Sequence, residues 1–152
     1  MAKDIPLSEI TLRRYEKPEN LDKRELVRKI CLSLGLLQPG DSRDVVVDIL
    51  HVLILRGIEN SWINSEDIRK NVISEREKRN MQLVGIAPSN IRRQIRRLRN
   101  LFLVEKKDNK YRIHEFEKVN KLYEDRIKKF YLGNIMERVD EYFDEIAKIY
   151  EK

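Results

Sequence analysis

The segment from Ser89 to Asn100 holds the residues best suited to binding chemistry. It carries five arginines and no acidic residue within twelve positions. Exposed arginines can make paired hydrogen bonds to guanine edges or to phosphates, and asparagine and glutamine can pair with adenine. Like charges this close on a helix repel one another, each pair by about 0.2–0.5 kcal/mol. An arginine face that only keeps a helix soluble usually mixes charges of both signs, so we expect this segment to bind an anion.

The spacing of apolar residues predicts which side of this segment is exposed. At about 100° per residue on a helical wheel, Ile91, Ile95, Leu98 and Phe102 fall within one narrow sector, which should pack inward. The opposite side carries Ser89, Arg93, Arg96, Arg97 and Asn100, with Asn90 and Arg92 on its flanks.

The net charge of +6 is concentrated around this segment. Residues 61–115 hold fourteen basic and seven acidic side chains, whereas residues 1–60 hold ten of each and residues 116–152 hold eight basic and nine acidic. One basic region between two nearly neutral ones favours a dedicated surface for an anionic partner over a uniform basic coat. Nucleic acid is therefore the leading candidate partner.

Other chemistries find little support in the sequence. His51 lies among apolar residues and His114 closes a predicted hairpin, and neither has a partner at the spacing of a nucleophilic or metal site. Cys31 has no second cysteine for a disulfide, and we expect it to be a small core residue. A glycine-rich phosphate loop is absent. We expect no enzyme activity, no metal and no cofactor, although catalytic residues gathered from distant segments remain an open alternative.

Length and composition indicate a soluble globular protein. The chain has 152 residues, of which 41% are hydrophobic and 38% charged, which fits one domain with an appendage. Its longest apolar runs fall far short of the roughly 20 residues that cross a membrane. The first residues contain no apolar signal region. We therefore expect an intracellular, cytoplasmic protein without a membrane partner.

Apolar periodicity predicts three helices before the basic segment. A helix over 20–34 ends at Gly35, which suits a left-handed stop. A second helix over 42–57 begins after a cap at Asp41 or Ser42, and it is so apolar that it should be central to the core. A short β segment at 61–63 then precedes a helix over 65–73 capped by Asn64 or Ser65. The highly charged run from Glu75 to Met81 either extends this helix or forms a second short one.

The basic helix and a hairpin follow in the predicted order of elements. Pro88 in a first helical turn, with Ser89 as a possible cap, starts a helix over 89–102. Two β-prone runs then form a hairpin over 103–113, whose tip at Asp108 and Asn109 tolerates left-handed geometry.

Two further helices are predicted over 115–131 and 134–151, with a break or bend at Gly133–Asn134. In the second helix, apolar residues recur in alternating steps of four and three, which is a heptad seam. The seam consists of Ile135, Val139, Tyr142, Ile146 and Ile149, and it is widened by Met136, Phe143 and Tyr150. These helices either fold back over the domain or pair with a second copy, and we favour pairing into a homodimer.

From residue 42 to residue 113, the order of elements resembles the winged helix-turn-helix family of archaeal and bacterial transcription regulators. The resemblance implies a mainly α fold, in which a three-helix core and a β-hairpin wing occupy 41–114. An N-terminal arm and helix over 1–40 precede this domain, and a C-terminal helical extension over 115–152 follows it as the expected dimerisation element. One departure is the interval from Ser74 to Ala87, which is longer than the usual helix-turn-helix connection.

In that family the helix after the turn enters the DNA major groove, and the wing lies along the phosphate backbone or the minor groove. By position, the recognition-helix contacts would be Ser89, Asn90, Arg93, Gln94, Arg97 and Asn100. The wing over 104–113 would contribute Lys106, Lys107, Lys110 and Arg112. The three lysines are also ordinary residues of a hairpin tip, where they discourage edge aggregation.

The resemblance and the charge distribution together predict a double-stranded DNA-binding protein, most simply a transcriptional regulator. As a homodimer it would place two basic helices on half-sites about one duplex turn apart. Two alternatives stay open: a winged-helix module that docks its basic helix on an acidic protein of a replication or transcription assembly, and an RNA-binding protein.

Overall fold

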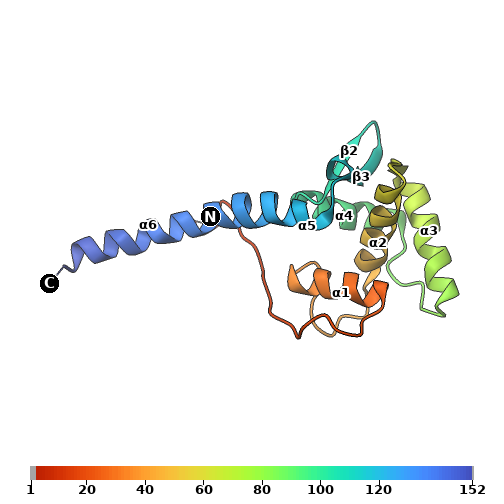
Figure 1. Ribbon diagram of the computed structural model, residues 1–152, viewed down its shortest axis with the longest axis horizontal. Helices are drawn as coiled ribbons and strands as arrows, with labels where there is room; N and C mark the ends of the chain where they lie inside the picture. The colour runs from red at the N-terminus through yellow and green to blue at the C-terminus, as the bar shows by residue number, and fades with distance from the viewer. Residues whose placement is uncertain (1–2, 152) are drawn as a thin grey trace.

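The computed structural model describes residues 3–151, and one apolar helix lies at the centre of its core. This helix, α2 (Val45–Ile58), packs against α1 (Lys23–Ser33), α3 (Ser65–Lys78) and α4 (Pro88–Asn100) (Figure 1). Its first six residues are all buried. The central position expected of the most apolar helix is therefore confirmed.

Side chains and backbone conformation fix the helix ends. The Asp22 carboxylate accepts a hydrogen bond from the Glu25 backbone N–H at the start of α1 (2.8 Å). The Asn64 side chain accepts one from the Asp67 N–H at the start of α3 (2.8 Å), which confirms Asn64 as a cap. Gly35 follows α1 with φ +73°, the left-handed conformation expected of a stop. The α2 helix begins at Val45, later than predicted from a cap at Asp41 or Ser42.

Three short strands form a small antiparallel sheet in the order β1-β3-β2. In the hairpin of β2 (Val104–Lys107) and β3 (Lys110–Ile113), Asp108 and Asn109 have φ 51° and 60°, which confirms the left-handed tip. The third strand, β1 (Ile63–Asn64), pairs with β3 so that Ile63 lies opposite Tyr111. The fold is therefore mainly helical with a three-stranded sheet.

After the hairpin, the chain forms one continuous helical rod instead of two helices. The rod consists of α5 (Val119–Leu122), the π-helical segment η2 (Tyr123–Leu132) and α6 (Gly133–Ile149). Gly133 has φ −56° and ψ −43°, so of the break or bend predicted at Gly133–Asn134 the break is wrong. A glycine inside a helix costs only about 1 kcal/mol relative to alanine, and the residues around it continue the helix. The predicted start at 115 is also wrong, because Glu115 has φ 56° within a short 3₁₀ turn, η1 (His114–Phe116).

Only the first part of this rod packs on the domain. Leu122 and Ile127 are buried, and the Phe102 ring packs edge-on against Phe130 and Tyr131, with centroids 6.0 and 5.5 Å apart. The α6 helix extends away from the domain (Figure 1), and none of its described residues is buried. The alternative in which the last helix folds back over the domain is therefore wrong. Among residues 3–151, no helix has the length and apolarity that crossing a membrane would need.

Candidate nucleic-acid interface

The α4 helix buries one apolar stripe and leaves its charged side outward. Ile91, Ile95 and Leu98 are each fully buried, as the helical wheel predicts. Pro88 occupies the first turn as expected, where its missing N–H is not needed. The predicted cap at Ser89 is wrong: Ala87, whose side chain cannot accept a hydrogen bond, occupies the N-cap position.

Six polar side chains of α4 are exposed and form a surface that we call the arginine face. They are Ser89, Arg92, Arg93, Arg96, Arg99 and Asn100. Within residues 3–151, none of these four arginines forms an ion pair with a carboxylate, although ion pairs occur on α3, β2, η2 and α6. The outward orientation that the sequence predicts for Ser89, Arg92, Arg93, Arg96 and Asn100 is therefore confirmed.

Three residues expected on this surface are instead half-buried on one flank of α4. Asn90 Nδ2 donates to the Gly85 carbonyl (2.7 Å), and Gln94 Nε2 donates to Asn90 Oδ1 (3.1 Å). Arg97 donates to Gln94 Oε1 (2.8 Å) and to the Gly35 carbonyl (3.2 Å). The prediction that Arg97 lies on the fully exposed side is wrong, because this chain of hydrogen bonds ties α4 to two glycine turns.

The helical wheel could not reveal which flank a neighbouring element covers. The turn at Gly35 lies against the Arg97 side of α4, so the exposed sector shifts toward Arg92 and Arg99. Arg99 is consequently part of the arginine face, although it was not among the predicted contacts. Its membership of the same acid-free arginine run was the signal that could have included it.

The charges on α4 crowd one another. Burial, and after it the charge of Arg93, lowers the pKa of Arg97. The Arg97 guanidinium nevertheless stays charged, because the ordinary arginine pKa is about 12.5 or higher. A bound anion would relieve the mutual repulsion of Arg93, Arg97 and their neighbours.

The tip of the hairpin adds a second group of cations, which we call the basic tip. It consists of Lys106, Lys107 and Lys110, all exposed as predicted. Lys107 lies directly opposite Lys110 in the ladder, a pairing of like charges that is unfavourable without a counter-charge. Lys106 Nζ lies 5.8 Å from the centre of the Tyr111 ring.

Arg112, the fourth residue predicted for the hairpin surface, is half-buried. Its guanidinium lies over the rings of Trp62 and Phe116, 4.4 and 4.6 Å from their centres, and these two rings meet edge to face. Its Nε lies 3.2 Å from the Glu105 carboxylate. Burial opposes ionisation of Glu105, but a hydrogen bond from the Glu115 N–H and the nearby positive charge of Arg112 lower the pKa of its carboxyl group. We therefore reassign Arg112 from a surface contact to a residue that secures the base of the hairpin.

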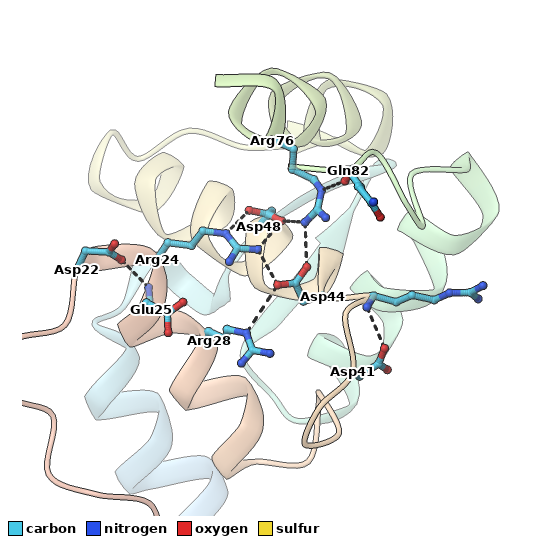
Figure 2. A network of polar contacts seen from close by, with 10 residues as sticks. Asp22, Arg24, Glu25, Arg28, Asp41, Asp44, Asp48, Arg76 and Gln82 are labelled. Carbon is cyan, nitrogen blue, oxygen red and sulfur yellow. Dashed lines mark hydrogen bonds and ion pairs between the residues drawn. The ribbon is translucent and has the colours of Figure 1, made fainter. Parts of the chain in front are cut away.

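A buried network of charges joins α1, α2 and α3 (Figure 2). Arg24, Asp44, Asp48 and Arg76 come from or directly precede three different helices, and each is only 2–6% exposed. Arg24 donates to Asp48 (2.9 Å) and Asp44 (3.0 Å), and Arg76 donates to the same two carboxylates (2.7 and 3.0 Å). Two positive and two negative groups therefore balance within the core.

This network also positions the long connection that leads into α4. Arg76 Nε donates to the Gln82 carbonyl (2.7 Å), and Arg69 Nε donates to the Ile86 carbonyl (2.6 Å). The interval from Ser74 to Ala87 is longer than usual, but α3 continues to Lys78 and so takes up about one turn of it. Two arginines of α3 bind the backbone of the remaining connection. Burial opposes ionisation of Asp44, but hydrogen bonds from Arg76 and Arg24 hold the pKa of its carboxyl group below the usual value.

This network was not predicted from the sequence. Its signal was the pair Asp44 and Asp48, four residues apart at the start of an otherwise apolar helix. Cys31 is fully buried, and burial raises the pKa of its thiol to about 12, so it is the core residue expected. Among the described residues, no group of three or more histidines, cysteines and carboxylates could hold a metal ion.

Fold and surface together define a mainly helical protein that presents an exposed cationic helix next to a basic hairpin tip. Comparisons with family models, curated proteins and solved structures found no match to this chain.

Proposed function

We propose that this protein binds double-stranded DNA as a winged helix-turn-helix transcriptional regulator. The observation that carries the proposal is the arginine face, with four exposed guanidinium groups and no carboxylate paired to any of them in the described part of the chain. In this proposal α4 is the recognition helix and the hairpin of β2 and β3 is the wing. A regulator of this kind works in the cytoplasm.

The roles of individual side chains follow from their exposure. Arg93 and Arg96 are exposed on the outward side of α4, and they would reach guanine edges or phosphates in the major groove, which is wide enough for a helix. Arg92 and Arg99, on the flank, are better placed for phosphates. Asn100 can pair with adenine.

The basic tip would contact the phosphate backbone beside the recognition helix. Strand β2 begins four residues after α4 ends and packs against it, so docking of α4 brings the hairpin close to the same duplex. Lys106, Lys107 and Lys110 carry no base-specific geometry, and they would strengthen binding to all sequences alike. Asn90, Gln94, Arg97 and Arg112 support these elements from inside and make no direct contact in this proposal.

The proposal is tested by fluorescence anisotropy with a pool of random-sequence duplexes at several salt concentrations. For the wild type, binding should weaken steeply with salt, because each neutralised phosphate releases counterion. The variant Arg93→Ala/Arg96→Ala should bind at least about tenfold more weakly, with a salt slope reduced by up to about two if both arginines contact phosphates. The control Lys17→Ala/Lys148→Ala removes two exposed cations outside both basic surfaces and should bind like the wild type.

Three outcomes would overturn the assignment. Equal affinity of the wild type and the Arg93→Ala/Arg96→Ala variant for duplex would remove α4 from the interface. Competition by single-stranded or structured RNA at the same concentration as duplex would remove the preference for DNA. Absence of any duplex binding, together with tight binding to an acidic polypeptide, would favour the protein-interaction alternative.

We also propose that two copies form a homodimer through the C-terminal helices. The exposed apolar seam of α6 supports this partner, since a folded protein usually covers such a surface. Two recognition helices on one dimer would engage two half-sites, which multiplies both affinity and discrimination.

A further inference from the structure

The α6 helix exposes a continuous apolar stripe along most of its length. The stripe consists of Met136, Val139, Tyr142, Phe143, Ile146, Ile149 and Tyr150, which are between 47% and 77% exposed. Helices in water derive most of their stability from packing of an apolar face. The helix projects from the domain (Figure 1), and its apolar side chains are exposed, so the stripe is available to a partner.

We propose that α6 pairs with α6 of a second copy in an antiparallel coiled coil. This inference refines the homodimer proposed above, and it does not depend on DNA binding. Within α6 the heptad places Val139 and Ile146 at the a positions and Ile135, Tyr142 and Ile149 at the d positions. Leu132, the last residue of η2, continues the same pattern as a further a position. In an antiparallel pair each a residue faces a d residue, whereas in a parallel pair each residue faces its own copy.

Side-chain size favours the antiparallel arrangement. It sets the small Val139 against the partner's Tyr142, so that large and small residues alternate across the seam. A parallel pair would instead stack Tyr142 on the partner's Tyr142 and leave a narrow layer at Val139. Isoleucine at two of the three d positions also disfavours a parallel two-stranded coil, which prefers leucine there.

Charge complementarity points the same way. Arg138 and Glu145 occupy the two g positions of α6, which flank the seam. Antiparallel helices bring g positions of the two copies together. Each dimer would therefore form two ion pairs, one between Arg138 of each copy and the partner's Glu145. The e positions hold Met136 and Phe143, which would pack on each other across the opposite edge. A parallel pair would instead set the charged g residues against these apolar e residues.

Arg138 and Glu145 already form ion pairs within their own helix, but these pairs do not prevent pairing between two copies. Arg138 pairs with Glu141 (2.8 Å) and Glu145 pairs with Lys148 (3.4 Å), both within the exposed surface of the same helix. Exposed pairs of this kind contribute little to stability. A dimer can therefore form the intersubunit pairs at small cost.

This register fixes where the two domains lie. The midpoint of the coil falls between residues 140 and 141, and Phe102, just beyond α4, packs on Phe130 and Tyr131 about ten residues away. At about 1.5 Å per residue this places each domain ~15 Å from the midpoint along the rod, on opposite ends. The two arginine faces would thus be separated by ~30 Å or more along the rod, which suits half-sites one duplex turn or more apart.

Charge reversal tests the pairing. Sedimentation equilibrium on the full chain should show a dimer for the wild type. Arg138→Glu and Glu145→Arg should each raise the dimer dissociation constant about tenfold, because each creates two repulsive pairs. The double variant Arg138→Glu/Glu145→Arg restores both pairs and should return to within about threefold of the wild type. Glu137→Arg, an equal charge reversal on the outer side of α6, is the matched control and should leave the dimer unchanged.

Disulfide trapping tests the orientation independently. In the antiparallel register position 149 faces position 132 of the partner subunit, so Leu132→Cys/Ile149→Cys should form an intersubunit disulfide under mild oxidation and Ile149→Cys alone should not. Cys31 is fully buried and does not interfere. Circular dichroism checks that each variant keeps its helices.

The outcomes separate the two proposals. A wild type that stays monomeric at all concentrations overturns the dimer. Two results overturn the antiparallel orientation: cross-linking of Ile149→Cys alone, and failure of the double charge reversal to restore the dimer. None of these results bears on the arginine face, because binding of a duplex by α4 is measured separately with Arg93→Ala/Arg96→Ala.

Discussion

The helices α4 and α6 are both amphipathic, but they present opposite faces to the outside. The α4 helix buries its apolar stripe against α2 and exposes four arginines, whereas α6 buries nothing in the described chain and exposes its apolar stripe. Their charges differ as well: α4 carries five basic residues and no acidic one, and α6 carries two basic and five acidic residues. Sequence periodicity reveals an apolar stripe in each helix, but the structure decides which stripe is covered.

This contrast suggests a division of roles along the chain. The arginine face can attract a polyanion but offers little apolar surface for a protein partner. The acidic surface of α6 would repel a polyanion, yet its apolar stripe suits a second helix. Binding of DNA and self-association are therefore assigned to separate elements, and substitutions should affect one without the other.

The largest expected effect concerns the buried network of charges that joins α1, α2 and α3. Asp48→Ala leaves Arg24 and Arg76 with one shared carboxylate in the core, and the free energy of unfolding should fall by about 3–5 kcal/mol, as for other broken buried ion pairs. Urea unfolding followed by circular dichroism measures the loss. Asp125→Ala, which removes an exposed aspartate from η2, is the matched control and should cost less than about 0.5 kcal/mol.

A loss below about 1 kcal/mol for Asp48→Ala would show that the network does not stabilise this part of the molecule. Dimerisation under native conditions gives a second readout. Because α6 makes no contact with the network, the dimer dissociation constant should not change for Asp48→Ala as long as the domain stays folded. A change would mean that the two regions are coupled.

An effect of intermediate size on the free energy of unfolding is expected at low pH. Hydrogen bonds hold the folded-state pKa of Asp44 below its unfolded value of about 4. This contribution to stability is therefore fully present above about pH 4, and it is lost as the pH falls through the lower folded-state value. Unfolding measured between about pH 7 and 2 should show a steep acid limb. Asp44→Asn should be less stable at neutral pH and should lose less on acidification, and an unchanged slope in this variant would exclude Asp44 as its source.

Much of the fold was predictable because it depends on local patterns. Helix periodicity, the Asn64 cap, the stop at Gly35 and the left-handed hairpin tip are all set within a few residues. Continuity of the rod through Gly133 was not predictable, since a single glycine weakens a helix too little to end it. The buried pairing of Asp44 and Asp48 depends on Arg24 and Arg76, which lie 20 to 32 residues away along the chain.

In the candidate site, too, some features follow from local sequence patterns and others depend on distant residues. The buried stripe of α4 follows from spacing within one helix, and so do the exposed positions of Arg93 and Arg96. The covering of Arg97 depends on the turn after α1, 62 residues earlier, and no pattern within α4 encodes it. The packing of Arg112 against the rings of Trp62 and Phe116 similarly requires the pairing of β1 with β3.

The smallest expected effect separates the two flanks of α4. Arg97→Ala removes hydrogen bonds to Gln94 and to the Gly35 carbonyl, so the free energy of unfolding should fall by about 1 kcal/mol. Arg96→Ala removes an exposed side chain of the same type one position away and should leave stability within about 0.5 kcal/mol of the wild type. Duplex affinity should respond in the opposite order, with Arg96→Ala the more damaging of the two, because only Arg96 is free to reach DNA. The opposite result would be a loss of stability in Arg96→Ala and a loss of duplex affinity in Arg97→Ala alone. It would reverse the assignment of the two flanks, and the recognition surface would then have to face the turn at Gly35.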